Sequence, residues 1–180
     1  MVDTFDISSI SSQRTICFPL RSTYGINLGM KLKGFGKGKY NGYGGKFDRA
    51  KGDVDIEDTA IRELEEESTI QVHKSDLKKL AIIDFIFPYA PNFNQRVHIY
   101  IIRNWKGRFR KTDEMAPRWF DTRKLPYDKM WDSDKTWMPK IISGETFYAR
   151  FFWKEDNEAV DEEKSCTDYA LKDAPFLALK

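Results

Sequence analysis

The sequence is poor in cysteine, has no long apolar run and carries almost no excess of charge of either sign. Cys17 and Cys166 lie far apart without paired spacing, so neither a disulfide framework nor a zinc site is indicated and a reduced, cytoplasmic setting is expected. The longest apolar run, AIIDFIFPYA, is interrupted by Asp84 and Pro88 and is too short to span a bilayer. The formal charge of +2 is too small to indicate binding to nucleic acid or to an anionic membrane, so neither is expected as a main partner.

The length and composition fit one globular domain. A chain of 180 residues that is 41% hydrophobic buries a substantial core, so residues 1–180 are assigned to a single domain. Residues 1–12 lack the basic start and apolar segment of a signal peptide and are expected to form a flexible arm. The acidic segment 154–163 is expected to be an exposed loop. The sequence of the tail at 173–180 indicates no role for it.

Strand-like and helical patterns alternate along the chain without a regular βαβ rhythm. A helix is predicted from Asp55, where Asp58 three residues on resembles a capping box, to about Ser68. A second helix is predicted in DKTWMPKIIS, where Pro139 confines the helix start to nearby positions. The segments predicted to be strands are RTICFPL, TYGINLGMKL, LAIIDFIF, RVHIYIIR, PRWFD, FYARFFW and DYALKD. This mixture favours an α+β or α/β sandwich with a mixed sheet.

The first predicted helix crowds negative charge into the stretch AIRELEEESTI at 60–70. At 100° per residue, Glu63, Glu66 and Glu67 share an arc about 100° wide, beside an apolar stripe that includes Leu64. Clustered carboxylates suit hard cations such as Mg²⁺, which prefers a few carboxylates, several waters and a substrate phosphate. On charge alone, an ordinary acidic surface helix is the simpler interpretation.

A glycine-rich segment, GFGKGKYNGYGGK, precedes this helix. It matches neither a Walker loop nor the dinucleotide-binding fingerprint. Gly42, Gly44 and Gly45 nevertheless allow a backbone carbonyl to approach a metal or phosphate closely. Residues 31–51 contain seven bases and one acid, and residues 53–67 contain eight acids and one base. A basic wall beside an acidic one suits a metal-bound polyphosphate, although two unrelated charged surfaces would give the same pattern.

Taken together, the GG at 44–45 and RELEEESTI at 62–70 resemble the Nudix box. Further stretches resemble its MutT-homolog branch, the oxidised purine nucleoside triphosphatases or 8-oxo-dGTP diphosphatases: LGMKLKGFGKGKYNGYGGK before the box, and TDEMAPRWF and PYDKMWDSDKTWMP after it. The likeness covers roughly residues 13–172 and is more specific than the box alone. It implies a Nudix fold, an α/β/α sandwich with a mixed β-sheet between helices.

The resemblance implies a divalent-metal site on the acidic helix. Arg62 would pair with a box carboxylate and orient it rather than bind metal. The implied cofactor is Mg²⁺, with Mn²⁺ as an alternative. The implied metal ligands are Glu63, Glu66, Glu67, Glu114 and the carbonyl of Gly44.

The same resemblance implies a purine-binding end. Asn41 and Asp134 match the polar groups that contact the purine edge, and Trp131 matches a stacking wall. Lys31 and Phe35 match further pocket residues. Without the resemblance, Asn41 in a turn, Asp134 as a helix N-cap and Trp131 in the core are the simpler interpretations.

Three departures from the family pattern bear on the site. The spacing between Gly45 and Arg62 is three residues longer than in the box, and Val54 stands where its first Glu would fall, so that acid is lost or shifted to Asp53 or Asp55. At the last box glycine stands Thr69, a β-branched residue unsuited to the left-handed conformation, so a different exit from the helix is expected. Ser133 replaces the first of two consecutive Asp, which makes base selectivity less secure than hydrolysis.

The resemblance implies a Mg²⁺-dependent diphosphatase that converts oxidised purine nucleoside triphosphates such as 8-oxo-dGTP to the monophosphate and pyrophosphate, preventing DNA damage by cleaning the nucleotide pool. One alternative is a Nudix hydrolase of another nucleoside diphosphate derivative. Another is a catalytically weak nucleotide-binding module, against which the three helix acids argue. A small-molecule nucleotide is the expected partner of a monomer in the cytoplasm, with nuclear and mitochondrial pools left open. Structural roles are expected for His73 and His98.

Overall fold

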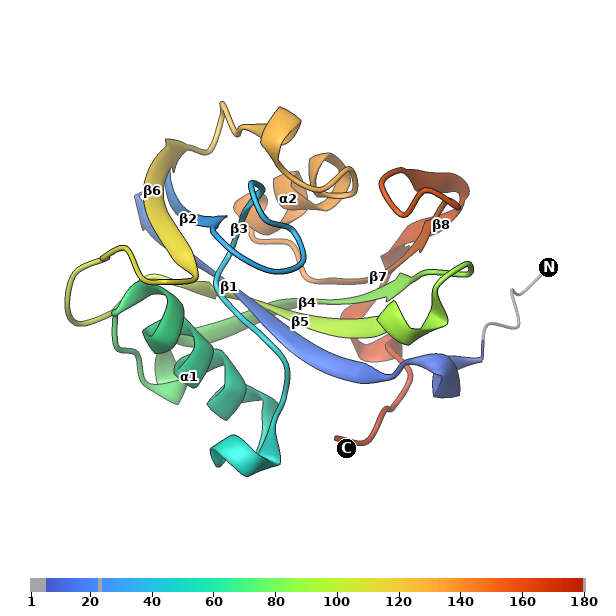
Figure 1. The fold of residues 1–180 in the computed structure, drawn as a ribbon, viewed down its shortest axis with the longest axis horizontal. Coiled ribbons are helices and arrows are strands. Elements are labelled where there is room, and N and C mark those ends of the chain that lie inside the picture. The colour runs from blue at the N-terminus through green and yellow to red at the C-terminus, as the bar shows by residue number, and fades with distance from the viewer. Residues whose placement is uncertain (1–5, 23, 180) are drawn as a thin grey trace.

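The computed structural model describes residues 6–22 and 24–179 (Figure 1). Two α-helices and eight strands make up the regular structure of this part of the chain. The strands are β1 Ser12–Ser22, β2 Gly25–Lys31, β3 Tyr40–Asn41, β4 Leu77–Ile86, β5 Gln95–Ile102, β6 Met115–Asp121, β7 Phe147–Trp153 and β8 Val160–Tyr169. The helices are α1 Ile56–Ser68 and α2 Asp134–Ser143. Within the described residues, neither helix has the length and apolar character needed to cross a membrane.

The strands form one mixed sheet. Their order is β3-β2-β1-β5-β4-β7-β8, and β6 pairs with β2 along the whole length of β2. The pairs β1–β5 and β4–β7 are parallel, whereas the other neighbours are antiparallel. The predicted mixed sheet is therefore confirmed.

The two helices cover opposite faces of the sheet (Figure 1). Side chains alternate along β5, so that Ile99 and Ile101 join the core cluster beneath α2, whereas Tyr100 and Ile102 join the cluster beneath α1. Trp137 of α2 is almost fully buried in the first cluster. This arrangement confirms the predicted α/β/α sandwich.

Helix α1 begins as its sequence predicts but ends differently from the expectation. Asp55 accepts a hydrogen bond from the backbone N–H of Asp58 at 3.0 Å, and the Asp58 carboxylate accepts one in return, which completes the capping box. Thr69 ends the helix in the left-handed conformation, with φ of 67°, so the prediction of a different exit was wrong. Its hydroxyl donates to the carbonyl of Arg108 at 2.8 Å, and this long-range contact offsets the strain of a β-branched residue there.

Helix α2 coincides with the predicted segment DKTWMPKIIS and begins five residues before Pro139. Pro139 lies inside the helix and cannot donate to the carbonyl four residues earlier. Packing compensates for this loss, because Trp137, Met138 and Ile141 of the same helix are buried in the core.

The acidic segment 154–163 is a loop only to residue 159. Strand β8 begins at Val160, which is buried and pairs with Trp153, and DYALKD contributes only its first two residues to that strand. An edge strand leaves one side open to water, so it tolerates the acids that made this segment resemble a loop.

The two ends of the described chain pack against the sheet. Ile10 is buried with Ile86 and Phe152, so the expected flexible arm is wrong for residues 7–12, while residues 1–5 lie outside the described part. The C-terminal segment runs below the sheet, on the same side of it as α1 (Figure 1). There Gln13 donates to the carbonyls of Leu177 and Ala178 at 3.0 and 2.9 Å.

Candidate active site

Arg62 organises the carboxylates at one end of the site. Its guanidinium donates to both oxygens of Asp53 at 2.9 and 2.8 Å, to Glu63 at 2.7 Å and to Glu66 at 3.3 Å. The guanidinium lowers the pKa of Asp53 to about 2 despite burial of that carboxyl. Of the two acids beside Val54, Asp53 is therefore the one that pairs with Arg62, since Asp55 caps the helix.

Glu67 is buried on the same helix and faces the glycine-rich segment. One carboxylate oxygen accepts from the backbone N–H of Gly44 at 2.9 Å, and the other lies 3.4 Å from the Lys31 ammonium. Burial raises the pKa of Glu67 to about 7, although Lys31 and the Gly44 amide oppose the shift. The carboxylate is short of positive charge in its present surroundings.

Gly44 and Gly45 have backbone positions that no larger residue fits. A Cβ on Gly44 would lie 2.0 Å from the carbonyl oxygen of Thr15, and one on Gly45 would lie 2.3 Å from the Glu63 carboxyl carbon. Among the described residues, nothing donates a hydrogen bond to the Gly44 carbonyl. The backbone at Gly44 and Gly45 therefore does approach neighbouring groups closely, as the sequence predicted.

The predicted metal ligands are only partly gathered. Among the described residues, no three acidic, histidine or cysteine side chains converge closely enough to hold an ion. Glu66 is half exposed, 3.6 Å from the Lys51 ammonium, and Glu114 lies 3.2 Å from that of Lys33. The donor set still fits a hard divalent cation, because it combines a carbonyl without a partner with a buried carboxylate short of positive charge.

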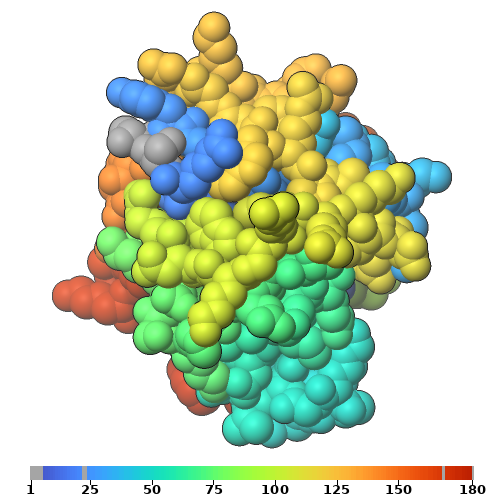
Figure 2. Space-filling view, turned by 90° about the vertical axis from the view of Figure 1, so that its left-hand side faces the viewer, coloured from blue at the N-terminus to red at the C-terminus, as the bar shows by residue number. Residues whose placement is uncertain are grey.

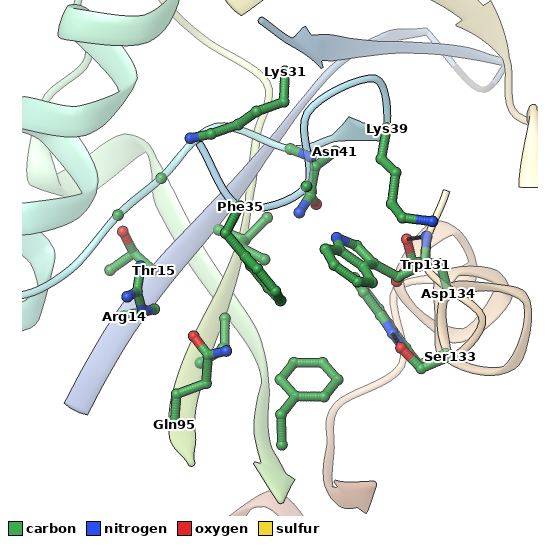
Figure 3. Close-up of a pocket in the computed structure, with 18 of the residues that line it drawn as sticks. Arg14, Thr15, Lys31, Phe35, Lys39, Asn41, Gln95, Trp131, Ser133 and Asp134 are labelled. Carbon is green, nitrogen blue, oxygen red and sulfur yellow. Dashed lines mark hydrogen bonds between the residues drawn. The ribbon is translucent and has the colours of Figure 1, made fainter. Parts of the chain in front are cut away.

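A pocket extends from Gly44 and Gly45 to an aromatic end (Figure 3). Trp131 lies on its far wall and stacks on Phe35 with ring centroids 4.9 Å apart, while Phe35 also stacks on Phe93 at 5.6 Å. The Lys39 ammonium lies 4.9 Å from the Trp131 ring centroid. Trp131 is therefore partly buried in the pocket wall rather than in the core.

Polar groups surround this aromatic end. Asp134 is buried, accepts from the backbone N–H of Trp131 at 3.0 Å, and has its pKa raised to about 7 by burial. It is the first residue of α2, and Ser133, also buried, holds the N-cap position. Asn41 accepts from the Gly42 N–H at 2.8 Å and is directed into the pocket (Figure 3). Asn41, Asp134, Trp131, Lys31, Phe35 and Ser133 all line this pocket.

Sequence reasoning missed several lining residues. Arg14 and Gln95 border both this pocket and a second, adjoining one that also contains Lys31, Lys33 and Glu114. These two residues come from β1 and the start of β5, whose pairing places Gln13 opposite Arg96. The alternation of side chains along each strand could have predicted which face of the sheet each residue lies on. Only the pairing of the two strands, however, brings both side chains to one pocket.

These features agree with the comparison to known families. The NUDIX domain family matches residues 16–141, and the chain belongs to that family. Nudix hydrolases generally use divalent metal ions. The predicted family and fold are confirmed.

Two curated relatives carry a more particular name. The chain is 40% identical over 126 residues, 70% of this chain and 77% of the relative, to an oxidized purine nucleoside triphosphate hydrolase of Danio rerio. It is 35% identical over 132 residues, 73% and 81% of the two chains, to a protein of the same name from Mus musculus.

A solved structure supports the fold. The MutT protein of Bacillus halodurans superposes with a TM-score of 0.70 at 18% identity, covering 87% of this chain and 97% of that one.

Proposed function

We propose that the protein is a Mg²⁺-dependent nucleoside triphosphate diphosphatase that hydrolyses oxidised purine nucleotides such as 8-oxo-dGTP to the monophosphate and pyrophosphate. The observation that carries the proposal is one pocket that joins the Gly44 segment, which holds Glu67, to an end containing Trp131, Asn41 and the buried Asp134. The names of the curated relatives support the substrate class.

The acidic end suits the phosphate chemistry. Glu63, Glu66, Glu67 and the Gly44 carbonyl would hold Mg²⁺, with Glu114 contributing from the adjoining pocket. When bound, the ion neutralises phosphate charge and polarises the attacking water. Arg62 fixes the Glu63 carboxylate through a 2.7 Å contact and so positions it for this role.

A basic wall suits the polyphosphate. Arg14, Lys31 and Lys33 line the adjoining pocket next to Glu114. Arg14 forms no ion pair with any carboxylate in the described part of the chain. Its guanidinium is therefore available for phosphate oxygens, for which its geometry is suited.

The aromatic end suits selection of the base. A carboxyl with a pKa of about 7 is present in both protonation states near neutral pH, so Asp134 supplies a donor in one and an acceptor in the other. This compensates in part for Ser133, which stands where the family branch has a second Asp. Trp131 presents a flat apolar surface for stacking.

Two alternatives compete with this proposal. A Nudix hydrolase of another nucleoside diphosphate derivative would use the same acidic end with a different base pocket. A weak nucleotide-binding module would keep the pocket and lack turnover. The pre-arranged Arg62 network favours an enzyme, because a module that only binds has no need to orient Glu63.

A substrate screen with Mg²⁺ tests these possibilities. Oxidised, methylated and unmodified nucleoside triphosphates and dinucleoside diphosphates are compared, and release of pyrophosphate is scored against release of orthophosphate. The proposal predicts the highest kcat/KM for an oxidised purine triphosphate, with pyrophosphate as product. A preference for a diphosphate derivative, or tight binding without turnover, would each reject it. The monomeric state and the cytoplasmic location stay predictions.

A further inference from the structure

A second charged surface lies outside the pocket, on the loop between β5 and β6. Residues 103–111, with the sequence RNWKGRFRK, contain five bases and no acid, and we name this segment the basic loop. All five basic side chains are exposed. The segment crosses the middle of the face in Figure 2, in yellow-green, between α1 and the blue strands of the N-terminal half.

The charge of this surface is not neutralised by the protein. Within the described residues, none of the five basic side chains of the loop forms an ion pair or a side-chain hydrogen bond, and neither does that of Arg21. Arg21, at the end of β1, adds a further base, with its guanidinium 4.2 Å from the centroid of the Trp119 ring. The set consists of Arg21, Arg103, Lys106, Arg108, Arg110 and Lys111.

Backbone contacts fix the basic loop on the C-terminal end of α1. The N–H of Arg110 donates to the carbonyl of Ser68 at 3.2 Å, and Gln71 and Lys106 exchange two backbone hydrogen bonds of 2.9 and 2.8 Å. Basic groups near a helix C-terminus also complement its dipole. That effect does not account for Arg21, which lies on a different element.

Aromatic side chains are interleaved with these bases. Trp105, Phe109 and Trp119 are partly exposed and form a cluster, with ring centroids 5.6 Å apart for Trp105–Phe109 and 5.5 Å for Phe109–Trp119. Phe109 packs inward on Tyr43, with centroids 6.1 Å apart. The rings therefore form a fixed platform rather than a protruding tip.

We propose that the basic loop, with Arg21 and Trp119, binds single-stranded nucleic acid. The guanidinium and ammonium groups contact phosphates, and the partly exposed rings of Trp105 and Trp119 stack with bases. An anionic membrane fits less well, because interfacial insertion requires aromatic side chains to lead, whereas here Phe109 is folded back on Tyr43. An acidic protein segment would use the charges but not the rings.

The net charge of +2 gives no sign of the basic loop and Arg21. The bases of the loop are offset in the total by acids elsewhere, notably the eight between residues 53 and 67. The expectation that nucleic acid is not a main partner rested on the total alone. Association with an anionic polymer depends on the local potential, which six neighbouring bases make positive.

The first experiment removes charge from the loop. The variant carries Arg108→Gln, Arg110→Gln and Lys111→Gln, which keep the backbone contacts. A matched control carries Lys129→Gln, Lys154→Gln and Lys172→Gln, the same change of net charge on other elements. Binding of a labelled oligothymidylate of about 16 nucleotides, the upper range for such sites, is followed by anisotropy against salt concentration.

The wild type and the control are expected to bind alike. The loop variant is expected to bind at least about tenfold more weakly, with a log–log salt slope shallower by about 2, at roughly 0.7 per lost phosphate contact. Nucleotide hydrolysis and the melting temperature serve as folding controls and should be unchanged in the loop variant. Equal weakening of the control, or an unchanged loop variant, would overturn the assignment.

The second experiment tests the aromatic platform. An abasic strand of equal length should bind about fivefold more weakly or worse, because stacking is lost while the phosphates remain. Equal affinity would reject base contacts. Displacement of the oligonucleotide by saturating deoxyguanosine monophosphate would place it in the active-site pocket instead. Binding of phosphatidylserine vesicles without binding of the oligonucleotide would assign the surface to membranes.

Discussion

Two buried carboxyls, Glu67 beside the Gly44 end of the pocket and Asp134 at its aromatic end, both have a pKa raised to about 7, yet the surroundings of the two groups differ. Glu67 faces the Lys31 ammonium and the nearby Glu63 carboxylate, so the positive charge around it does not balance the negative charge. Asp134 accepts from the Trp131 N–H and has a cation only at a distance, in Lys39. Burial is therefore the common cause of both raised pKa values, and under the proposed function the one carboxyl would hold a cation and the other would contact a purine edge.

The largest effect is expected for Glu67→Gln, which tests the role of the buried carboxyl at the acidic end. Turnover with saturating Mg²⁺ should fall by about two to four orders of magnitude, because the site loses a carboxylate that would hold the ion and its attacking water. Folding should be nearly intact, although Glu67 is buried rather than on the charged surface that the helix pattern suggested, because Gln still accepts from the Gly44 N–H and carries no buried charge.

A control on the same helix sharpens that test. Glu65→Gln removes an exposed carboxylate that contacts Gln71 and none of the site residues. Its turnover and melting temperature should match the wild type. Turnover retained in Glu67→Gln, or lost equally in both variants, would contradict the role of the acidic end.

Asp134→Asn should change stability with a definite dependence on pH. In the folded chain Asp134 keeps its proton to about pH 7, whereas in the unfolded chain it loses it near the ordinary pKa of 3.8. The folded state therefore binds more protons between these values, and the free energy of unfolding contributed by this group falls as pH rises from about 4 to about 7. Asparagine does not ionise, so the free energy of unfolding of the variant does not fall in this way. Urea denaturation should therefore find the variant more stable than the wild type at pH 8, by at most about 4 kcal/mol.

At about pH 3, below the ordinary pKa of 3.8, both states of the wild type are largely protonated, so the stabilities of Asp134→Asn and the wild type should converge. A constant difference across the pH range would mean that burial does not control the protonation of this carboxyl.

The smallest effect is expected for Asn41→Ala, at the base end. Loss of one hydrogen bond to the purine edge should lower kcat/KM for 8-oxo-dGTP by about tenfold. The value for dGTP, measured in parallel, should fall less. Equal losses for the two nucleotides would argue against a base-reading role and for a turn residue that shapes the Tyr40–Asn41 strand.

How much of this was predictable depends on whether the relevant interactions are local. The capping box of α1 and the clustered acids follow from spacing along one helix, so the sequence was sufficient for them. The left-handed Thr69 was not predictable, because its compensation comes from the carbonyl of Arg108, thirty-nine residues away. Arg14 and Gln95 meet only through strand pairing, which a single strand does not specify.

The C-terminal segment has a consequence for how its sequence is constrained. Gln13 and Arg96 hold it by main-chain oxygens of Pro175, Leu177 and Ala178, atoms that every amino acid possesses. Its path is thus set largely by groups that bind main-chain atoms, so most of its side chains are free to vary, except that Leu177 packs against the Ile10 cluster and should stay apolar. Substitutions elsewhere in this stretch that keep Leu177 should leave its route under the sheet unchanged.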